Sequence, residues 1–257
     1  MSNNIVEPVR AMNLSMVEAS DLSSTTGRKT WNAALVTKEY LKRCGVEGKR
    51  VCDVSSGNGF LAMALSLLGA AEVYATECPA CVRLLQANFD SNFDSNKQGD
   101  RVKPIAIEYS WGDDMSKVTS SITSTSRTCS DDDKAIEEEP LDLYVFSDLL
   151  YICFRDDILS LFETTLKDLL SSDKTVGVFC YETRLTVKEQ AFIDDFLKVT
   201  FDTTELDCDQ EGLLEACKES EDGTVEEGDF GSIFYTPPTM RLLLLRRKKG
   251  SAPIPYM

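Results

Sequence analysis

A glycine-containing turn is the first place in this sequence where backbone and side chains could form a ligand site. The segment Val51–Phe60 (VCDVSSGNGF) begins as a buried strand-like run and then turns at Gly57 and Gly59. Small residues let backbone amides approach a ligand closely, and the N-terminus of a following helix favours a carboxylate or phosphate. Glu77 stands eighteen residues after Gly59, at the end of the next strand-like run, where an acid can accept both hydroxyls of a ribose. Either feature alone is common, but the two together predict a nucleoside cofactor.

An acid on the first strand narrows the choice of cofactor further. The third glycine of the NAD and FAD fingerprint is missing, since Phe60 follows Gly59, whereas Asp53 precedes Ser55, Gly57 and Gly59 at alternate positions. A carboxylate at Asp53 can position the ammonium group of an amino-acid tail. We therefore predict S-adenosylmethionine (AdoMet) as the cofactor, bound by these turn residues and by the acid that ends the next strand.

Asp148 and Tyr151 follow another strand-like run, and their chemistry suits an amine acceptor. In an open α/β sheet, ligands bind at the carboxyl ends of the strands where the strand order reverses, here between the first and fourth strands. Methyl transfer from a sulfonium needs an amine with a free lone pair that is aimed at the methyl group. A carboxylate can orient the amine and an aromatic face attracts its cationic form, so we predict Asp148 and Tyr151 as catalytic residues, with Asp148 also facing the cofactor. The alternative roles are a helix cap and a core aromatic residue.

The elements that must position these residues alternate along the chain. Strand-like runs followed by helical patterns predict a Rossmann-like α/β fold, with a seven-stranded, mostly parallel sheet and helices on both faces. The last two runs lack a clear intervening helix of comparable length, so we expect an antiparallel strand at one edge. The expected strands are 50–54, 72–76, 102–107, 141–147, 175–181, 200–206 and 240–246, and the expected helices are 58–68, 79–89, 158–170 and a stretch after residue 186.

Length favours one domain, which we place at residues 27–249, between an N-terminal extension (1–26) and a C-terminal tail (250–257). Residues 119–130 hold nine Ser or Thr in twelve, and an acidic run follows. We predict a flexible insertion at 119–140 and an acidic loop at 205–229.

Composition excludes several classes of function. The 43 acids and 27 bases give a net charge of −16, of which the segments 131–140 and 205–229 contribute −5 and −10. Such a chain repels phosphate backbones, so we expect no nucleic-acid partner; the acidic segments are solvated loops or attract a basic protein substrate. The absence of histidine excludes Ser-His-Asp and Cys-His nucleophiles and His-containing zinc sites. The number of cysteines is odd (nine), which favours a reducing compartment: the cytoplasm, with the nucleus also compatible. No apolar run reaches the ~20 residues that a membrane helix needs, so we expect no membrane partner.

With these motifs in order, the chain resembles the seven-β-strand, class I methyltransferases, and among them the group that methylates lysines on non-histone proteins. The resemblance spans about residues 27–247 and rests on Gly27–Ala34 with Trp31, the loop Asp53–Gly59, Glu77, Asn88, Trp111-Gly112, Asp148-Leu-Leu-Tyr151 and, more loosely, Tyr181-Glu-Thr-Arg184. It implies that Trp31 and Trp111 contact the cofactor. Two positions depart from the family, whose loop usually opens with glutamate and glycine where this chain has Asp53 and Ser55. The shorter acid and the added Cβ predict weaker binding or a shifted loop.

Cys78 and Cys81 form a C-x-x-C pair at a helix start, a spacing used by redox and metal sites. The other cysteines do not supply a second pair for zinc. We therefore expect packing residues here and no metal site.

Three hypotheses remain from the sequence. The chain is an AdoMet-dependent methyltransferase acting on a lysine of another protein, or one acting on a histidine or arginine nitrogen or a small amine, or a non-catalytic interaction module. Nothing in the sequence demands more than a monomer.

Overall fold

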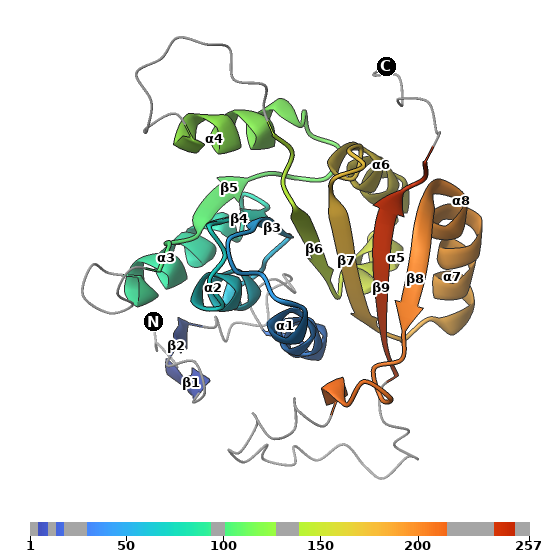
Figure 1. Ribbon diagram of the computed structural model, residues 1–257, viewed down its shortest axis with the longest axis horizontal. Coiled ribbons are helices and arrows are strands. Elements are labelled where there is room, and N and C mark those ends of the chain that lie inside the picture. Colours follow the sequence, from blue (N-terminus) through green and yellow to red (C-terminus); the bar gives the residue numbers. More distant parts are fainter. Residues whose placement is uncertain are drawn as a thin grey trace.

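The computed structural model describes residues 30–93, 101–126, 139–214 and 239–249, together with the backbone of two short N-terminal strands (Figure 1). The strands are β1 (Ile5–Val9), β2 (Leu14–Val17), β3 (Arg50–Val54), β4 (Glu72–Glu77), β5 (Ile105–Glu108), β6 (Leu143–Ser147), β7 (Val176–Glu182), β8 (Phe201–Leu206) and β9 (Met240–Arg247). The helices are α1 (Asn32–Cys44), α2 (Phe60–Leu67), α3 (Val82–Asn92), α4 (Ser116–Ser126), α5 (Leu150–Arg155), α6 (Leu159–Leu169), α7 (Thr186–Ala191), the π-helical segment η3 (Phe192–Leu197) and α8 (Lys198–Thr200).

One seven-stranded sheet organises the fold, in the order β5-β4-β3-β6-β7-β9-β8. Strands β3 to β7 pair in parallel, whereas β9 runs antiparallel between β7 and β8. The predicted fold class is therefore confirmed, and the reversed strand lies one position inside the sheet edge. Strand order reverses between β3 and β6, so the carboxyl ends of these two strands flank the crevice where open α/β sheets bind ligands.

Both faces of the sheet are buried, because successive residues of its central strands belong to opposite hydrophobic clusters. On β6, Leu143 and Val145 pack with residues of α1, α2 and α3, whereas Tyr144 and Phe146 pack with residues of α4, α5, α6 and η3. Helix α2 is buried from Phe60 to Ser66, as expected for an almost wholly apolar helix against a sheet.

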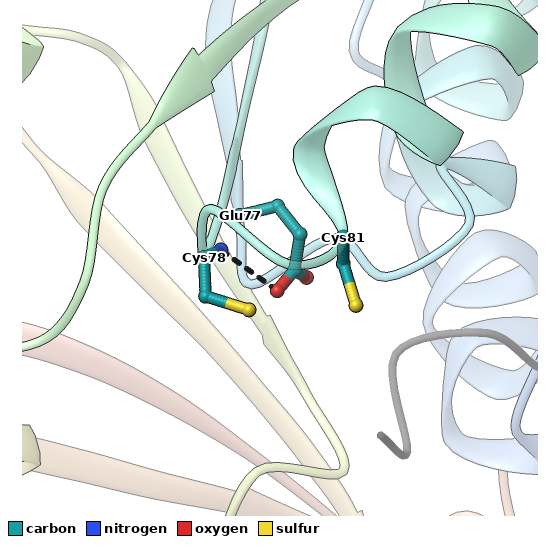
Figure 2. Close-up of side chains that lie close together, drawn as sticks. All are labelled: Glu77, Cys78 and Cys81. Carbon is teal, nitrogen blue, oxygen red and sulfur yellow. Dashed lines mark hydrogen bonds between the residues drawn. The ribbon is translucent and has the colours of Figure 1, made fainter. Parts of the chain in front are cut away.

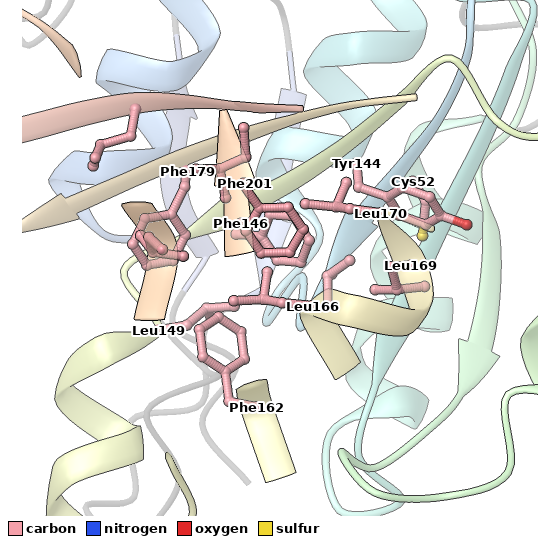
Figure 3. Packing of buried hydrophobic residues seen from close by; sticks show 14 of the residues in the cluster. Cys52, Tyr144, Phe146, Leu149, Phe162, Leu166, Leu169, Leu170, Phe179 and Phe201 are labelled. Carbon is pink, nitrogen blue, oxygen red and sulfur yellow. The ribbon is translucent and has the colours of Figure 1, made fainter. Parts of the chain in front are cut away.

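Phe162 of α6 belongs to the second cluster and lies close to several other aromatic rings (Figure 3). Its ring lies 6.1 Å from Phe146, 6.0 Å from Phe179, 6.2 Å from Phe192 and 4.7 Å from Trp111, measured between ring centroids. Phe162 is fully buried, and the Trp111 indole packs against its ring at an interplanar angle of 42°.

Three segments differ from the sequence-based expectation or extend it. The start of the predicted flexible insertion is helical, since α4 reaches Ser126 and buries Val118 and Ile122 in the second cluster; residues 127–138 lie outside the described residues. Within the predicted N-terminal extension, β1 and β2 form an antiparallel pair that the sequence did not predict. Most of the acidic loop, 215–229, and the tail 250–257 lie outside the described residues.

Candidate active site

A cavity of about 640 Å³ opens at the carboxyl ends of β3, β4 and β6. Eight of the nine predicted site residues line it: Trp31, Asp53, Ser55, Gly57, Glu77, Trp111, Asp148 and Tyr151. The ninth, Gly59, is not among the lining residues. The structure thus brings together side chains from segments that are far apart in the sequence.

The loop after β3 is held by β4. The backbone N–H of Ser55 donates to Thr76 Oγ1 at 3.1 Å, and that of Ser56 donates to the Thr76 carbonyl at 2.9 Å. Ser55 has a φ of +55°, a left-handed conformation that glycine adopts more readily. Serine at this position is therefore accommodated with some backbone strain.

Gly59 serves the packing of the loop against α3. Its φ is +87°, and a Cβ at this position would lie 2.6 Å from both Leu85 Cδ1 and Phe89 Cε1. No side chain fits there without displacing buried atoms. The sequence predicted Gly59 as a cofactor-binding residue; in the structure it is not among the residues that line the cavity, and it packs against α3.

Glu77 ties the end of β4 to the loop after β3. Its Oε2 accepts from the Gly57 N–H at 2.7 Å, and its Oε1 accepts from the Cys78 N–H at 2.9 Å (Figure 2). Burial raises the pKa of this carboxyl, and the two backbone hydrogen bonds oppose that shift. A carboxylate has about four acceptor positions, so Glu77 retains capacity for the hydroxyls of a ligand.

Asp53 is the second buried acid of the cavity. Ser56 Oγ donates to Asp53 Oδ2 at 2.5 Å, and the exposed fraction of Asp53 is 2%. Burial raises the pKa of Asp53 to about 7; the Ser56 bond opposes this shift, and the charge of Glu77 adds to it. A cationic ligand group placed beside Asp53 would favour the carboxylate form.

Cys78 and Cys81 lie beside Glu77 (Figure 2), and the possible metal-ligand atoms of the three residues are within 4.8 Å of one another. Sequence reasoning considered the two cysteines as a pair and did not count the adjacent Glu77 as a third possible ligand. Burial, with the charge and hydrogen bond of Glu77, raises the pKa of Cys78 to about 12. Because the thiolate is the reactive form, this environment disfavours redox exchange, and a packing role stays our prediction.

Two buried polar atoms of the cavity lining have no hydrogen-bond partner among the described residues. They are Nε1 of Trp111 and Oγ of Ser147, at the end of β6. Buried polar groups are nearly always satisfied, so a donor and a hydroxyl left unpaired at a cavity wall fit a ligand with polar atoms of its own. Trp31, which precedes α1, lines the same cavity.

Asp148 forms a bidentate ion pair with Arg184. The Oδ1 atom lies 2.7 Å from Nη1, and Oδ2 lies 2.9 Å from Nη2. Asp148 has a φ of +59°, and its backbone N–H donates to the Cys180 carbonyl on β7 at 2.8 Å. A non-glycine residue in this conformation is uncommon and is held by its surroundings, here by β7 and by Arg184.

The Tyr151 ring faces protein cations. The guanidinium carbon of Arg184 lies 5.5 Å from its centroid, and that of Arg155 lies 5.9 Å away. From the sequence we predicted that this aromatic face attracts the acceptor amine. In the structure, the guanidinium groups of Arg184 and Arg155 lie within cation–π distance of the ring. Tyr151 keeps an exposed fraction of 39% at the cavity mouth.

Ser147 and Arg184 were not among the predicted site residues. Both could have been found from their position, because each stands at or just after the carboxyl end of a predicted strand next to the crevice.

None of the helices in the described part of the chain is long and apolar enough to cross a bilayer.

Several known proteins are similar to this chain. A solved structure, a putative RNA methyltransferase from Pyrococcus horikoshii, superimposes with a TM-score of 0.48 at 16% identity, covering 91% of this chain and 93% of that chain. The Candida albicans protein N-terminal and lysine N-methyltransferase EFM7 is 27% identical over 129 residues, which are 49% of this chain and 46% of that protein. The Streptococcus mutans ribosomal protein L11 methyltransferase is 42% identical over 66 residues, 24% of this chain and 21% of that protein. The matches thus span less than half the length of either curated relative.

A family model described as lysine methyltransferase matches residues 11–199, well over half of the sequence. The match includes every predicted site residue, from Trp31 to Tyr151. This chain belongs to the lysine methyltransferase family.

Proposed function

We propose that this protein is an AdoMet-dependent methyltransferase that modifies a lysine side chain of a non-histone protein. The observation that carries the proposal is one cavity with two functional ends. Two buried acids, Asp53 and Glu77, line one part of it, and Asp148 lines the part beside the end of β6. Membership of the lysine methyltransferase family supports the same reaction.

The residues present fit the proposed cofactor. The ammonium group of its amino-acid tail would pair with Asp53, the ribose hydroxyls would donate to Glu77, and the adenine would lie near Trp111, whose unpaired Nε1 offers a donor. Trp31 would close the cavity from the side of α1. When bound, AdoMet supplies a methyl carbon whose bond to the sulfonium sulfur breaks, with the electron pair passing to sulfur, as the lysine nitrogen bonds to that carbon.

The acceptor end would act by orientation. Asp148 would accept a hydrogen bond from the lysine nitrogen, directing its lone pair at the methyl carbon, and the proton lost from nitrogen would pass to water. Tyr151 would shape the mouth through which the lysine enters. Alignment of this kind supplies much of the acceleration that an in-line displacement needs.

Calorimetry with S-adenosylhomocysteine tests the cofactor assignment. Glu77→Ala should weaken binding at least tenfold, because two ribose hydroxyls lose their acceptor. Glu108→Ala is the matched control, since Glu108 pairs with Glu77 in the β4–β5 register but is exposed and does not line the cavity. Equal affinities of the two variants would contradict the assignment.

Labelling with isotopic AdoMet tests the reaction. A cell extract incubated with wild-type enzyme should yield a protein methylated on lysine, identified by mass spectrometry of the modified atom. Asp148→Ala should abolish transfer and retain S-adenosylhomocysteine binding. A label on histidine, arginine or a small amine would replace the acceptor assignment, and failure of the wild type to bind any adenosyl ligand would favour a non-catalytic interaction module.

The partner proposals follow from charge. We expect a basic protein substrate attracted by the acidic segments, no nucleic-acid partner, and a monomer that works in the cytoplasm or also in the nucleus. Size-exclusion chromatography with light scattering tests the monomer, and the labelled proteins test the basic substrate.

A further inference from the structure

Arg184 occupies the acceptor end of the cavity as a fixed cation. It follows the end of β7, lines the cavity, and its side chain is 23% exposed. The guanidinium carbon lies near two rings, 5.7 Å from the Trp31 centroid and 5.5 Å from the Tyr151 centroid. The backbone N–H of Arg184 donates to the Glu189 carboxylate at 3.1 Å, which fixes the main chain as well. An arginine held at this many points is part of the site and is not a mobile surface side chain.

The hydrogen bonds of Asp148 leave one acceptor position open. Its Oδ1 accepts from Arg184 Nη1 and, at 3.3 Å, from the Glu182 N–H, and its Oδ2 accepts from Arg184 Nη2. A carboxylate offers about four lone-pair positions, so these three bonds leave room for one N–H of an incoming amine. The two parallel bonds from the guanidinium prevent the carboxylate from rotating about its bond to Cβ.

The same pairing sets the charge that an incoming amine meets. Asp148 and Arg184 form one ion pair. The other charges around it are Glu182 on β7, 3.1 Å from Nη2, Glu189 on α7, and Arg155 on α5, which is itself paired with Asp156. An unpaired carboxylate would favour the ammonium form of a lysine, which has no lone pair to attack with. Burial alone would lower the pKa of Arg184, but Asp148, Glu182 and Glu189 raise it, so the guanidinium stays charged.

We propose that Arg184 is the positioning residue of the acceptor site, holding the Asp148 carboxylate in one orientation and neutralising it so that lysine is received as the uncharged amine. The inference rests on the proposed function for its acceptor and cofactor. It adds a requirement that the acid alone does not meet: Asp148 must direct the nitrogen without stabilising its proton.

Cofactor binding gives a test that needs no acceptor. AdoMet carries a sulfonium charge that S-adenosylhomocysteine lacks, so the ratio of their dissociation constants reports the charge at the reactive end. Arg184→Gln should shift this ratio about fivefold in favour of AdoMet, because Asp148 is left unpaired, and Asp148→Asn should shift it about fivefold the other way. The double variant should return to within about twofold of wild type. A general loss of structure would weaken both ligands alike.

Kinetics with the lysine protein found by labelling separates charge from geometry. Arg184→Gln should move the rising limb of the kcat profile about one pH unit upward and lower kcat about a hundredfold at neutral pH, because kcat reports the ionisation of the bound lysine. Arg184→Lys keeps the positive charge but cannot form the two parallel hydrogen bonds to Asp148. Its pH profile should therefore match wild type, while kcat falls about tenfold.

Two results would overturn the proposal: an AdoMet preference that Arg184→Gln leaves within twofold of wild type, or a pH profile for Arg184→Lys that shifts as far as that of the glutamine variant. Should Arg184→Gln fail to fold, two other variants still test the proposal: Asp148→Asn should shift the ratio of the two dissociation constants, and Arg184→Lys should leave it unchanged. If wild-type enzyme labels no lysine, the proposed function fails, whereas the binding ratios still decide the role of Arg184.

Discussion

Cofactor affinity should depend on pH through Asp53, because this carboxyl is buried beside the cavity and its pKa is raised to about 7. At pH 6 roughly 90% of a group with this pKa is protonated, and at pH 8 roughly 10%. If only the carboxylate form pairs with the ammonium tail of the ligand, the apparent Kd increases about elevenfold at pH 6 and about 1.1-fold at pH 8. The dissociation constant of S-adenosylhomocysteine should therefore fall about tenfold between these pH values, or about 1.4 kcal/mol.

Calorimetry in two buffers of different ionisation enthalpy measures the linked proton directly. Binding at pH 6 should release about 0.9 proton and binding at pH 8 about 0.1, since the ligand cation lowers the pKa of Asp53. Asp53→Asn should bind more weakly at both pH values and lose the dependence. Glu77→Gln is the control: it removes a charge that raises the pKa of Asp53, so the dependence should persist with a lower midpoint. A wild-type Kd that is equal at pH 6 and pH 8, with no proton released, would refute this reasoning.

Three further predictions concern stability and packing, each measured by urea unfolding. Because the raised pKa of Asp53 lets the folded state keep a proton that the unfolded chain has released, stability without ligand should fall as pH rises from about 4 to 7, and Asp53→Asn should recover about 1–3 kcal/mol at pH 8 and little at pH 4; equal gains at both would contradict it. Gly59→Ala should cost about 2–4 kcal/mol through its clash with α3, whereas Gly48→Ala, with a φ of +73° but nothing within 4 Å of the added methyl, should cost about 1 kcal/mol. Phe162→Ala should cost about 3–5 kcal/mol and also weaken S-adenosylhomocysteine binding, because the support of Trp111 is lost; unchanged ligand affinity would separate Trp111 from the cofactor.

The sequence predicted the layout of the sheet because that information is local. Alternating strand and helix patterns, together with turns at Gly57 and Gly59, identify the crevice between β3 and β6 without knowledge of any long-range contact. Helix α4 was not predicted for a related reason: the high Ser and Thr content of this segment hid Val118 and Ile122, four residues apart, which pack α4 into the core. Composition gives only the average polarity of a segment, whereas a helix can pack against the core with a few apolar residues on one face.

The ion pair of the acceptor end could not be predicted in the same way. Asp148 and Arg184 are separated by 36 positions in the sequence, and each alone is consistent with a surface charge. Only the parallel pairing of β6 and β7 brings the residues after these strands together at one edge of the sheet. The raised pKa of Asp53 is equally non-local, because it depends on burial contributed by several elements.

The charges of the cavity are arranged unevenly, and the proposed reaction gives a reason. Within the described part of the chain, Asp53 and Glu77 accept hydrogen bonds from a hydroxyl, from backbone N–H groups and from the Cys78 thiol, and none of these donors is a cationic side chain. The two acids can therefore attract a cationic, hydroxyl-bearing ligand. Asp148 has the opposite arrangement, with both oxygens bonded to one guanidinium. An unpaired acid would strengthen binding at either end, but at the acceptor end it would also stabilise the ammonium form of lysine, which cannot react. A site that binds a positively charged methyl donor and needs an uncharged acceptor is therefore best served by unpaired acids at the first end and a paired acid at the second.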